Sequence, residues 1–124
     1  MKWASELKRL LVVCFSTVAA GVIFGQDINL PPLGGTQPFA TNAPVILIFV
    51  ADLSKLGSAT DEAKRNTANI NVGYISQNAY LYCASEGLVT GARGSVERKA
   101  LGAKLNLRPE QFIVLAQSVG YAKP

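Results

Sequence analysis

Runs of apolar residues predict three strands after residue 42. Val45–Ala51 is an unbroken apolar run in which four of seven residues are Val or Ile, a pattern typical of a strand covered on both faces. Leu88–Arg93 predicts a second, shorter strand. Phe112–Val119 predicts the third, because β-branched and apolar residues dominate it.

A helical pattern fills the space between the first two strands. Ser58 or Thr60 can accept hydrogen bonds from the first free N–H groups of a helix, and the acidic pair that follows suits the positive end of the helix dipole. Apolar residues at helical spacing continue to Glu86, with a break expected near residues 66–71. Gly87 stands where a left-handed C-cap is needed. A shorter helix is predicted over Val96–Asn106.

The order strand, helix, strand, helix, strand is compatible with two arrangements. It suits a parallel doubly wound sheet, and it suits an α+β layer equally well because the second helix is short. We predict the α+β class, with a small sheet of three strands packed on one long and one short helix. This domain would extend over residues 43–124.

The first 25 residues have the pattern of a signal peptide. Lys2, Lys8 and Arg9 form a basic start, and Leu10–Phe24 is an uncharged, mostly apolar run. The run is shorter than the roughly 20 residues that a membrane-spanning helix needs. Cleavage before Gln26 would give a periplasmic or secreted protein without membrane association, and an uncleaved anchor is the competing interpretation. The signal peptide prediction leaves residues 1–25 out of the fold.

Residues 26–42 contain three prolines and a Gly-Gly pair, which predicts an extended tether. After cleavage, nine basic and seven acidic side chains remain, so the net charge is +2. A charge this small and scattered does not indicate nucleic-acid binding.

The composition also restricts the chemistry. The chain has no His, which excludes His general bases and His-ligated zinc, and only Cys83 would remain after cleavage, which excludes a disulfide framework. Cys83 lies on the apolar side of the long helix and is expected to be a buried small hydrophobe. No Walker loop, GxGxxG, HExxH or GxSxG motif occurs. Chemistry would come from carboxylates, hydroxyls, amides, backbone groups or a bound cofactor.

Five short segments follow one another in a recognisable order: Ala43–Asp52, Gly73–Asn78, Ala84–Leu88, Ala92–Gly94 and Leu115–Tyr121. Together they resemble the nitroreductase-like FMN flavoprotein family, in particular its SagB-type dehydrogenase branch. The resemblance covers roughly residues 40–123.

The resemblance implies an α+β fold, usually a domain-swapped homodimer, with FMN at the subunit interface and the long helix along that interface. Family members pass a hydride from NAD(P)H, or from a small-molecule substrate, through the flavin. A loop after the second strand brings a backbone N–H to flavin N5, and in this sequence that loop is Arg93-Gly94. Since the flavin performs the electron transfer, the protein needs no nucleophile or histidine.

Five residues are candidates for cofactor binding: Arg93, Gly94, Gly73, Gln77 and Lys123. Arg93 belongs either to the N5 contact or to an edge strand with its side chain in water. Gly73 and Gln77 share a helix face that is either a polar flank or a stripe facing a dimer partner or cofactor. Lys123 can reach a phosphate or is a frayed terminal residue.

The sequence departs from the family pattern at its start. The Arg-rich phosphate-binding segment, two helices and a Pro-Ser-type loop are missing, which we interpret as loss of an internal segment. A dianionic phosphate needs cations or backbone donors, and the remaining candidates are Arg93, Arg108 and Lys123. Two functions stay open: an FMN-dependent oxidoreductase impaired by truncation, and a non-catalytic exported remnant or interaction module that binds no flavin.

Overall fold

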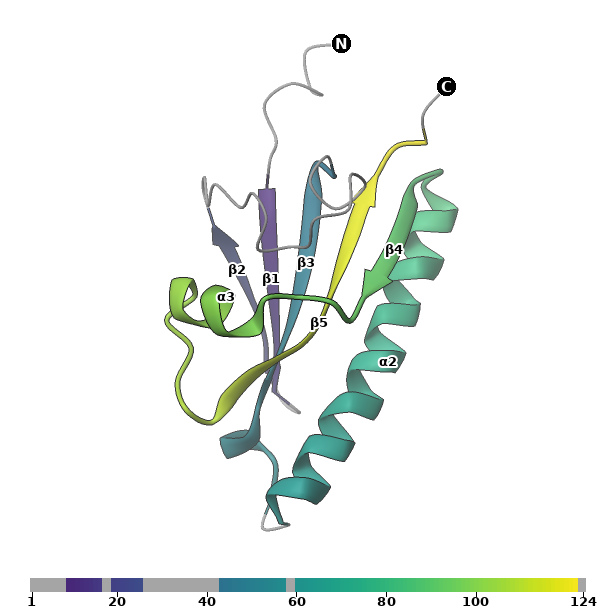
Figure 1. Cartoon of the computed structure of the whole chain (residues 1–124). Coiled ribbons are helices and arrows are strands. Elements are labelled where there is room, and N and C mark those ends of the chain that lie inside the picture. Colours follow the sequence, from purple (N-terminus) through teal and green to yellow (C-terminus); the bar gives the residue numbers. More distant parts are fainter. Residues whose placement is uncertain (1–8, 17–18, 26–42, 58–59, 123–124) are drawn as a thin grey trace.

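The computed structural model describes residues 9–16, 19–25, 43–57 and 60–122. These residues form one five-stranded sheet in the order β2-β1-β3-β5-β4 (Figure 1). β3 (Val45–Asp52) lies at the centre and pairs antiparallel with β5 (Gln111–Gly120). β4 (Val89–Arg93) pairs antiparallel with β5 and forms one edge of the sheet.

The three strands predicted from the sequence correspond to β3, β4 and β5. Each neighbouring pair among them is antiparallel, so the parallel doubly wound alternative is wrong. The α+β class is confirmed, with one long and one short helix packed on these strands.

Two further strands come from the segment that the sequence analysis left out of the fold. β1 (Arg9–Ser16) pairs parallel with β3, and β2 (Ala19–Gly25) pairs antiparallel with β1. The full chain therefore has a larger sheet than the three predicted strands. An uncharged apolar run looks the same in a signal peptide and in buried strands, so its pattern does not distinguish them. Cleavage before Gln26 stays a prediction, and the predicted tether over residues 26–42 lies outside the described residues.

The long helix, α2 (Asp61–Ser85), begins and ends as the sequence predicts. The Thr60 hydroxyl accepts a hydrogen bond from the Ala63 N–H at 3.3 Å. At the other end Gly87 has φ +65°, and the N–H of Leu88 donates to the carbonyl of Cys83 at 2.8 Å. The break expected near residues 66–71 is absent, because Asn and Thr cost only about half a kcal/mol each inside a helix and packing on the sheet outweighs this.

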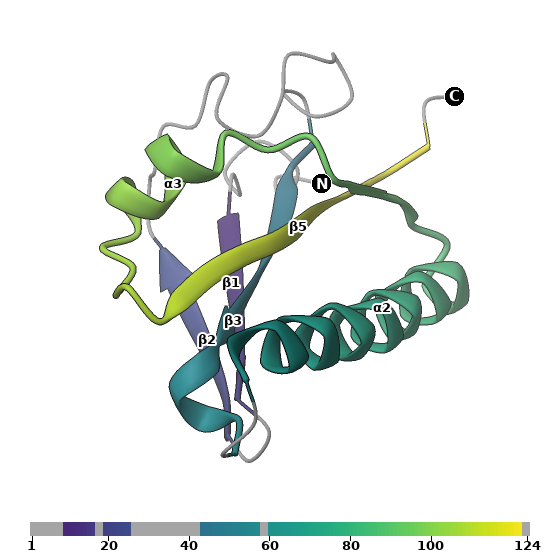
Figure 2. The same cartoon turned by 60° about the horizontal axis from the view of Figure 1, so that its bottom comes forward.

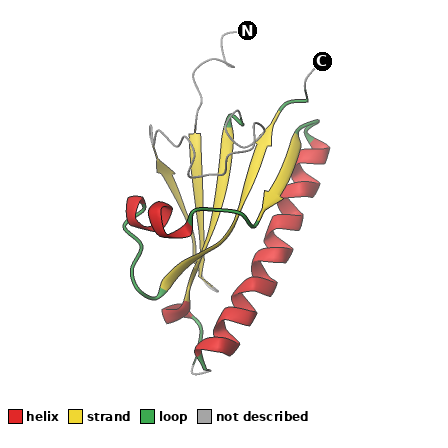
Figure 3. Ribbon diagram, viewed as in Figure 1, coloured by secondary structure: helices red, strands yellow, loops and turns green. Residues whose placement is uncertain are grey.

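The short helix, α3 (Arg98–Lys104), begins later than predicted, and a 3-10 helix, η1 (Leu53–Lys55), follows β3. α3 and α2 lie on opposite sides of β5 (Figure 2). Figure 3 shows α2 running alongside β4 at the edge of the sheet. The core toward α3 is a cluster of buried apolar side chains, Ile48, Val50, Val96, Leu101, Ile113 and Ala116. Toward α2, Ala68, Val72 and Cys83 are buried, which confirms the prediction for this cysteine.

β5 carries one extra residue relative to β3. Phe49 pairs with Leu115, but the next residue of β3 pairs with Ile113, so Val114 has no partner in the ladder. Arg98 donates from Nε to the carbonyl of Ile113 at 3.0 Å and from Nη2 to the carbonyl of Val114 at 2.8 Å. The guanidinium therefore satisfies carbonyls at the bulge and ties α3 to β5.

Candidate functional site

The Arg93-Gly94 pair lies where β4 ends. Arg93 is opposite Ala116 in the sheet and only 6% exposed, so the interpretation as an edge cation in water is wrong. Burial lowers the pKa of its guanidinium. Gly94 is exposed, and a Cβ added there would meet no atom within 4 Å. The backbone of this turn is therefore open to a ligand.

Gly73 and Gln77 are both exposed on α2. The buried residues of this helix are Ala68, Val72, Ser76 and Cys83, so the two candidates belong to a different face. Their interpretation as a polar flank or as a stripe facing a partner stays open. Lys123 lies outside the described residues.

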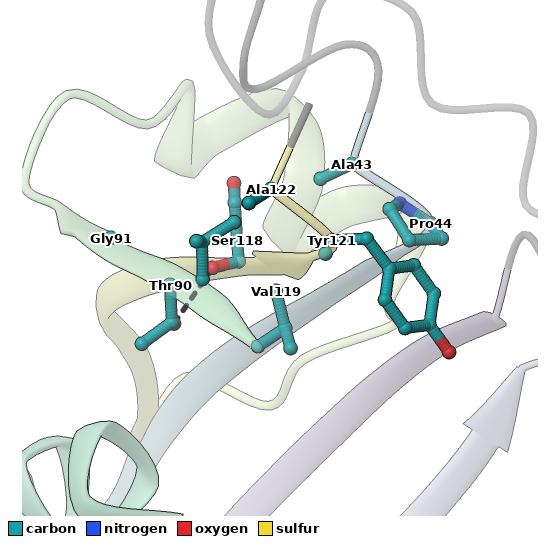
Figure 4. A pocket seen from close by; sticks show the side chains of 10 residues that line it. Ala43, Pro44, Thr90, Gly91, Ser118, Val119, Tyr121 and Ala122 are labelled. Carbon is teal, nitrogen blue, oxygen red and sulfur yellow. Dashed lines mark hydrogen bonds between the residues drawn. The ribbon is translucent and has the colours of Figure 1, made fainter. Parts of the chain in front are cut away.

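A pocket of about 400 Å³ opens at the other end of β4 (Figure 4). It is lined by Ala43 and Pro44 before β3, by Val89–Gly91 of β4, and by Ser118–Ala122 at the end of β5. None of the lining residues is charged. A volume in this range suits a small organic ligand.

Ser118 is one of the residues that line this pocket, and its hydroxyl is buried. The residue is 6% exposed, and its Oγ has no hydrogen-bond partner among the described residues. Such a group costs free energy, which a ligand with a complementary polar atom would recover. Gly91, opposite Ser118 in the ladder, leaves bare backbone, since a Cβ there would meet no atom within 4 Å. Sequence reasoning missed this pocket, although the segment Leu115–Tyr121 carried part of the resemblance.

Arg108, one of the candidate phosphate cations, is engaged at a different corner. Its guanidinium forms an ion pair with Asp52, which also accepts hydrogen bonds from the Ser54 N–H at 3.0 Å and from Gln111 Nε2 at 3.1 Å. Burial by itself raises the pKa of Asp52, but these hydrogen bonds and the charge of Arg108 outweigh it, so the pKa lies below its ordinary value. Arg108 therefore holds the end of β3 rather than the pocket.

The described part of the chain holds no cluster of three or more His, Cys, Asp or Glu side chains that could bind a metal ion. No helix in these same ranges is both long and apolar enough to cross a bilayer. The pocket and the Arg93-Gly94 turn, which lie at the two ends of β4, are the features that point to a ligand.

The profile of the nitroreductase family matches residues 6–121, nearly the whole chain. The chain belongs to the nitroreductase family. A comparison with curated proteins gives no match. Among solved structures, a candidate nitroreductase from Ralstonia eutropha JMP134, determined at 2.00 Å, is similar with a TM-score of 0.60 and 30% identity. The similarity covers 64% of this chain and 38% of that chain, so this nitroreductase-family chain spans less than half of its neighbour's length.

Nitroreductase family members typically use FMN with NAD(P)H. The described residues fit the uncharged part of a flavin, because bare backbone at Gly91 and Gly94 and the Ser118 hydroxyl can meet a flat polar ring. They supply no cation for the phosphate within the pocket. Lys123 follows Ala122 of the pocket wall directly in the sequence of this nitroreductase-family chain.

Proposed function

We propose that this chain is an FMN-dependent oxidoreductase that passes a hydride from NAD(P)H, or from a small-molecule substrate, through the flavin. The observation that carries the proposal is that β4 ends in an exposed glycine turn and borders an uncharged pocket, in a chain of the nitroreductase family. The flavin would supply the electron transfer, so the protein's part is to bind it, orient it and exclude water.

The residues of β4 and β5 have separate tasks in this proposal. A backbone N–H of the Arg93-Gly94 turn would donate to N5 of the ring. The hydroxyl of Ser118 would meet a polar edge of the ligand, since it is buried and lacks a partner among the described residues. Lys123 would meet the phosphate.

The partner that we propose is a second copy of the chain. Ile70, Tyr74 and Leu81 are 60–71% exposed and lie on the face of α2 opposite its buried residues. With Gln77 between them, their spacing alternates between four and three residues, as in the seam between two paired helices. An exposed apolar stripe of this kind favours association. Contact between two α2 helices would place Gln77 in the interface.

Finer placement within the family is also a proposal. The order of the five segments supports the SagB-type branch, and the tether pattern that runs directly into Phe39–Pro44 supports the loss of an internal segment. Comparison of the gene with its genomic neighbours tests the second point. An intact reading frame of the same short length in relatives would contradict a simple deletion.

The decisive experiment is to purify the full chain with excess FMN and record its visible spectrum. We expect a yellow protein that NADPH or NADH bleaches. Gly94→Val fills the turn without a clash and should weaken FMN binding about tenfold or more, while Gly57→Val, at another glycine with open space around it, should leave binding unchanged. A colourless protein that does not quench flavin fluorescence at high micromolar concentrations would overturn the proposal and leave the non-catalytic alternative.

A further inference from the structure

A tyrosine of α2 holds the outer edge of β4. The N–H of Ala92 donates to the hydroxyl oxygen of Tyr80, with 2.7 Å between N and O. In an edge strand the N–H groups point alternately toward the neighbouring strand and outward, and the Ala92 N–H donates outward to Tyr80. Tyr80 is half-buried and reaches the strand from one turn before the end of the helix.

A second polar connection between α2 and β4 passes through the interior. Ser76 Oγ donates to Gln117 Oε1 at 2.9 Å, and Gln117 Nε2 donates to Thr90 Oγ1 at 3.0 Å. Thr90 Oγ1 in turn donates to the carbonyl of Ser118 at 2.8 Å. Gln117 is completely buried, and each hydroxyl proton is used once, so the chain of hydrogen bonds runs in one direction and fixes the amide.

The Tyr80–Ala92 hydrogen bond and the Ser76–Gln117–Thr90 hydrogen bonds act on the same two elements, α2 and β4. Ser76 and Tyr80 are four residues apart and neighbours on the helix surface, while Thr90 and Ala92 are two residues apart on the same side of the strand. Two fixed points on a five-residue strand determine how that strand ends. The strand ends at Arg93, immediately after Ala92.

The Ala92 N–H does not need the Tyr80 hydroxyl merely to be solvated. Ala92 is exposed, so water could satisfy its N–H without any side chain. The tyrosine instead binds this N–H to one place on the helix. We propose that Tyr80, supported by the Ser76–Gln117–Thr90 chain, is a positioning residue that sets the Arg93-Gly94 turn for its contact with a flavin. This inference rests on the proposed function.

The test compares Tyr80→Phe with Tyr82→Phe in the full chain. Tyr82 lies on the same helix but is 63% exposed, so its hydroxyl is a matched control. Amide hydrogen exchange without flavin should become about tenfold faster at Ala92 in Tyr80→Phe, while amides of β3 and β5 keep their rates. Binding of FMN and of riboflavin should weaken by a similar factor. At saturating flavin, the absorption spectrum should shift, because the donor near the ring has moved; loss of stability alone would not shift it.

Each other outcome contradicts the inference. Unchanged exchange at Ala92, or equal acceleration in all strands, would show that Tyr80 does not fix this turn. Faster exchange with unchanged flavin affinity and spectrum would overturn the positioning role and leave the proposed function intact. If the unaltered chain binds neither FMN nor riboflavin, both proposals fall. Should Tyr80→Phe not fold, Ser76→Ala breaks the hydrogen bond to Gln117 without altering the pocket wall and should give the same changes at the turn.

Discussion

Asp52 and Arg108 form an ion pair that joins the end of β3 to the loop before β5, across 56 residues of sequence. The pair is asymmetric, because the Asp52 side chain is 4% exposed and that of Arg108 is 56% exposed. The buried carboxylate depends on its protein donors, whereas water can solvate the guanidinium. The carboxylate therefore determines how this corner responds to pH.

We expect a component of stability that requires ionised Asp52. Its pKa in the folded chain is lowered, so this component is fully present above the ordinary pKa of about 3.9 and is lost as the pH falls through the folded value. Urea unfolding from pH 6 to pH 2 should show a steeper loss in the unaltered chain than in Asp52→Asn. Parallel curves for the two proteins would contradict this assignment.

Arg98 should contribute more to the free energy of unfolding than a typical exposed residue of a short helix. Arg98→Ala removes both donors at the bulge and should lower the free energy of unfolding by about 1–3 kcal/mol. Arg98→Lys keeps the charge but not the forked geometry, so its free energy of unfolding should lie between those of the unaltered chain and Arg98→Ala. Lys99→Ala, at the next position, is the control and should change stability by less than about 0.5 kcal/mol. Chemical denaturation measures the free energy of unfolding of all three variants. Equal losses for Arg98→Ala and Lys99→Ala would contradict a stabilising role of Arg98 at the bulge.

Ser118→Ala should affect stability and binding in different directions. The variant removes a buried hydroxyl that has no partner among the described residues, so the free energy of unfolding without flavin should stay the same or rise by up to about 1 kcal/mol. FMN binding should weaken about three- to tenfold, because the pocket loses its buried hydroxyl. Thermal unfolding and fluorescence titration give the two quantities. A Ser118→Ala variant that is less stable and binds FMN as tightly as the unaltered chain would contradict this prediction.

Leu81→Glu should separate the dimer. A charge at Leu81, within the exposed stripe of α2, must be desolvated when two copies pair, and it has no partner there. Analytical ultracentrifugation should show a dimer for the unaltered chain and a monomer for the variant. Ala100→Glu, at an exposed position of α3, controls for the same change in net charge. A monomeric unaltered chain at high concentration would remove the basis of this prediction.

The N-terminus of the native protein tests the export prediction. The basic start and the apolar run predict cleavage before Gln26, and mass spectrometry of protein from its own host should find the N-terminus at or near this residue. An intact Met1 in the cytosol would contradict export. It would also mean that β1 stays paired with β3 along its length, as in the structure of the full chain.

The sequence predicts those elements whose signals are local. The apolar run of β3, the Thr60 cap and the Gly87 C-cap each depend on residues within one turn or strand, and all three appear as predicted. β1 and β2 were not predicted because their apolar run is also typical of a signal peptide. The pairing of β1 with β3 distinguishes strands from a signal peptide, and the sequence pattern does not show this pairing.

The site was harder to predict because its geometry depends on pairing between distant segments. Arg93 is buried because of its register with Ala116, which no pattern within the short strand reveals. Gln117 is a polar residue within a mostly apolar strand. Its meaning depends on Ser76, 41 residues earlier, and on Thr90.

The unpaired Val114 gives β5 one place where the chain can change length. Ile113 and Ala116 enter the same core cluster although they are three residues apart, because the extra residue reverses the alternation of faces between them. Loss of this residue would restore a regular ladder and leave every later side chain on its present face. Loss of Gln117 would also remove the bulge, but it would turn Ala116 out of the core cluster to the other face of the sheet. In related genes, single-codon deletions in this strand should therefore be found at the bulge and not beyond it.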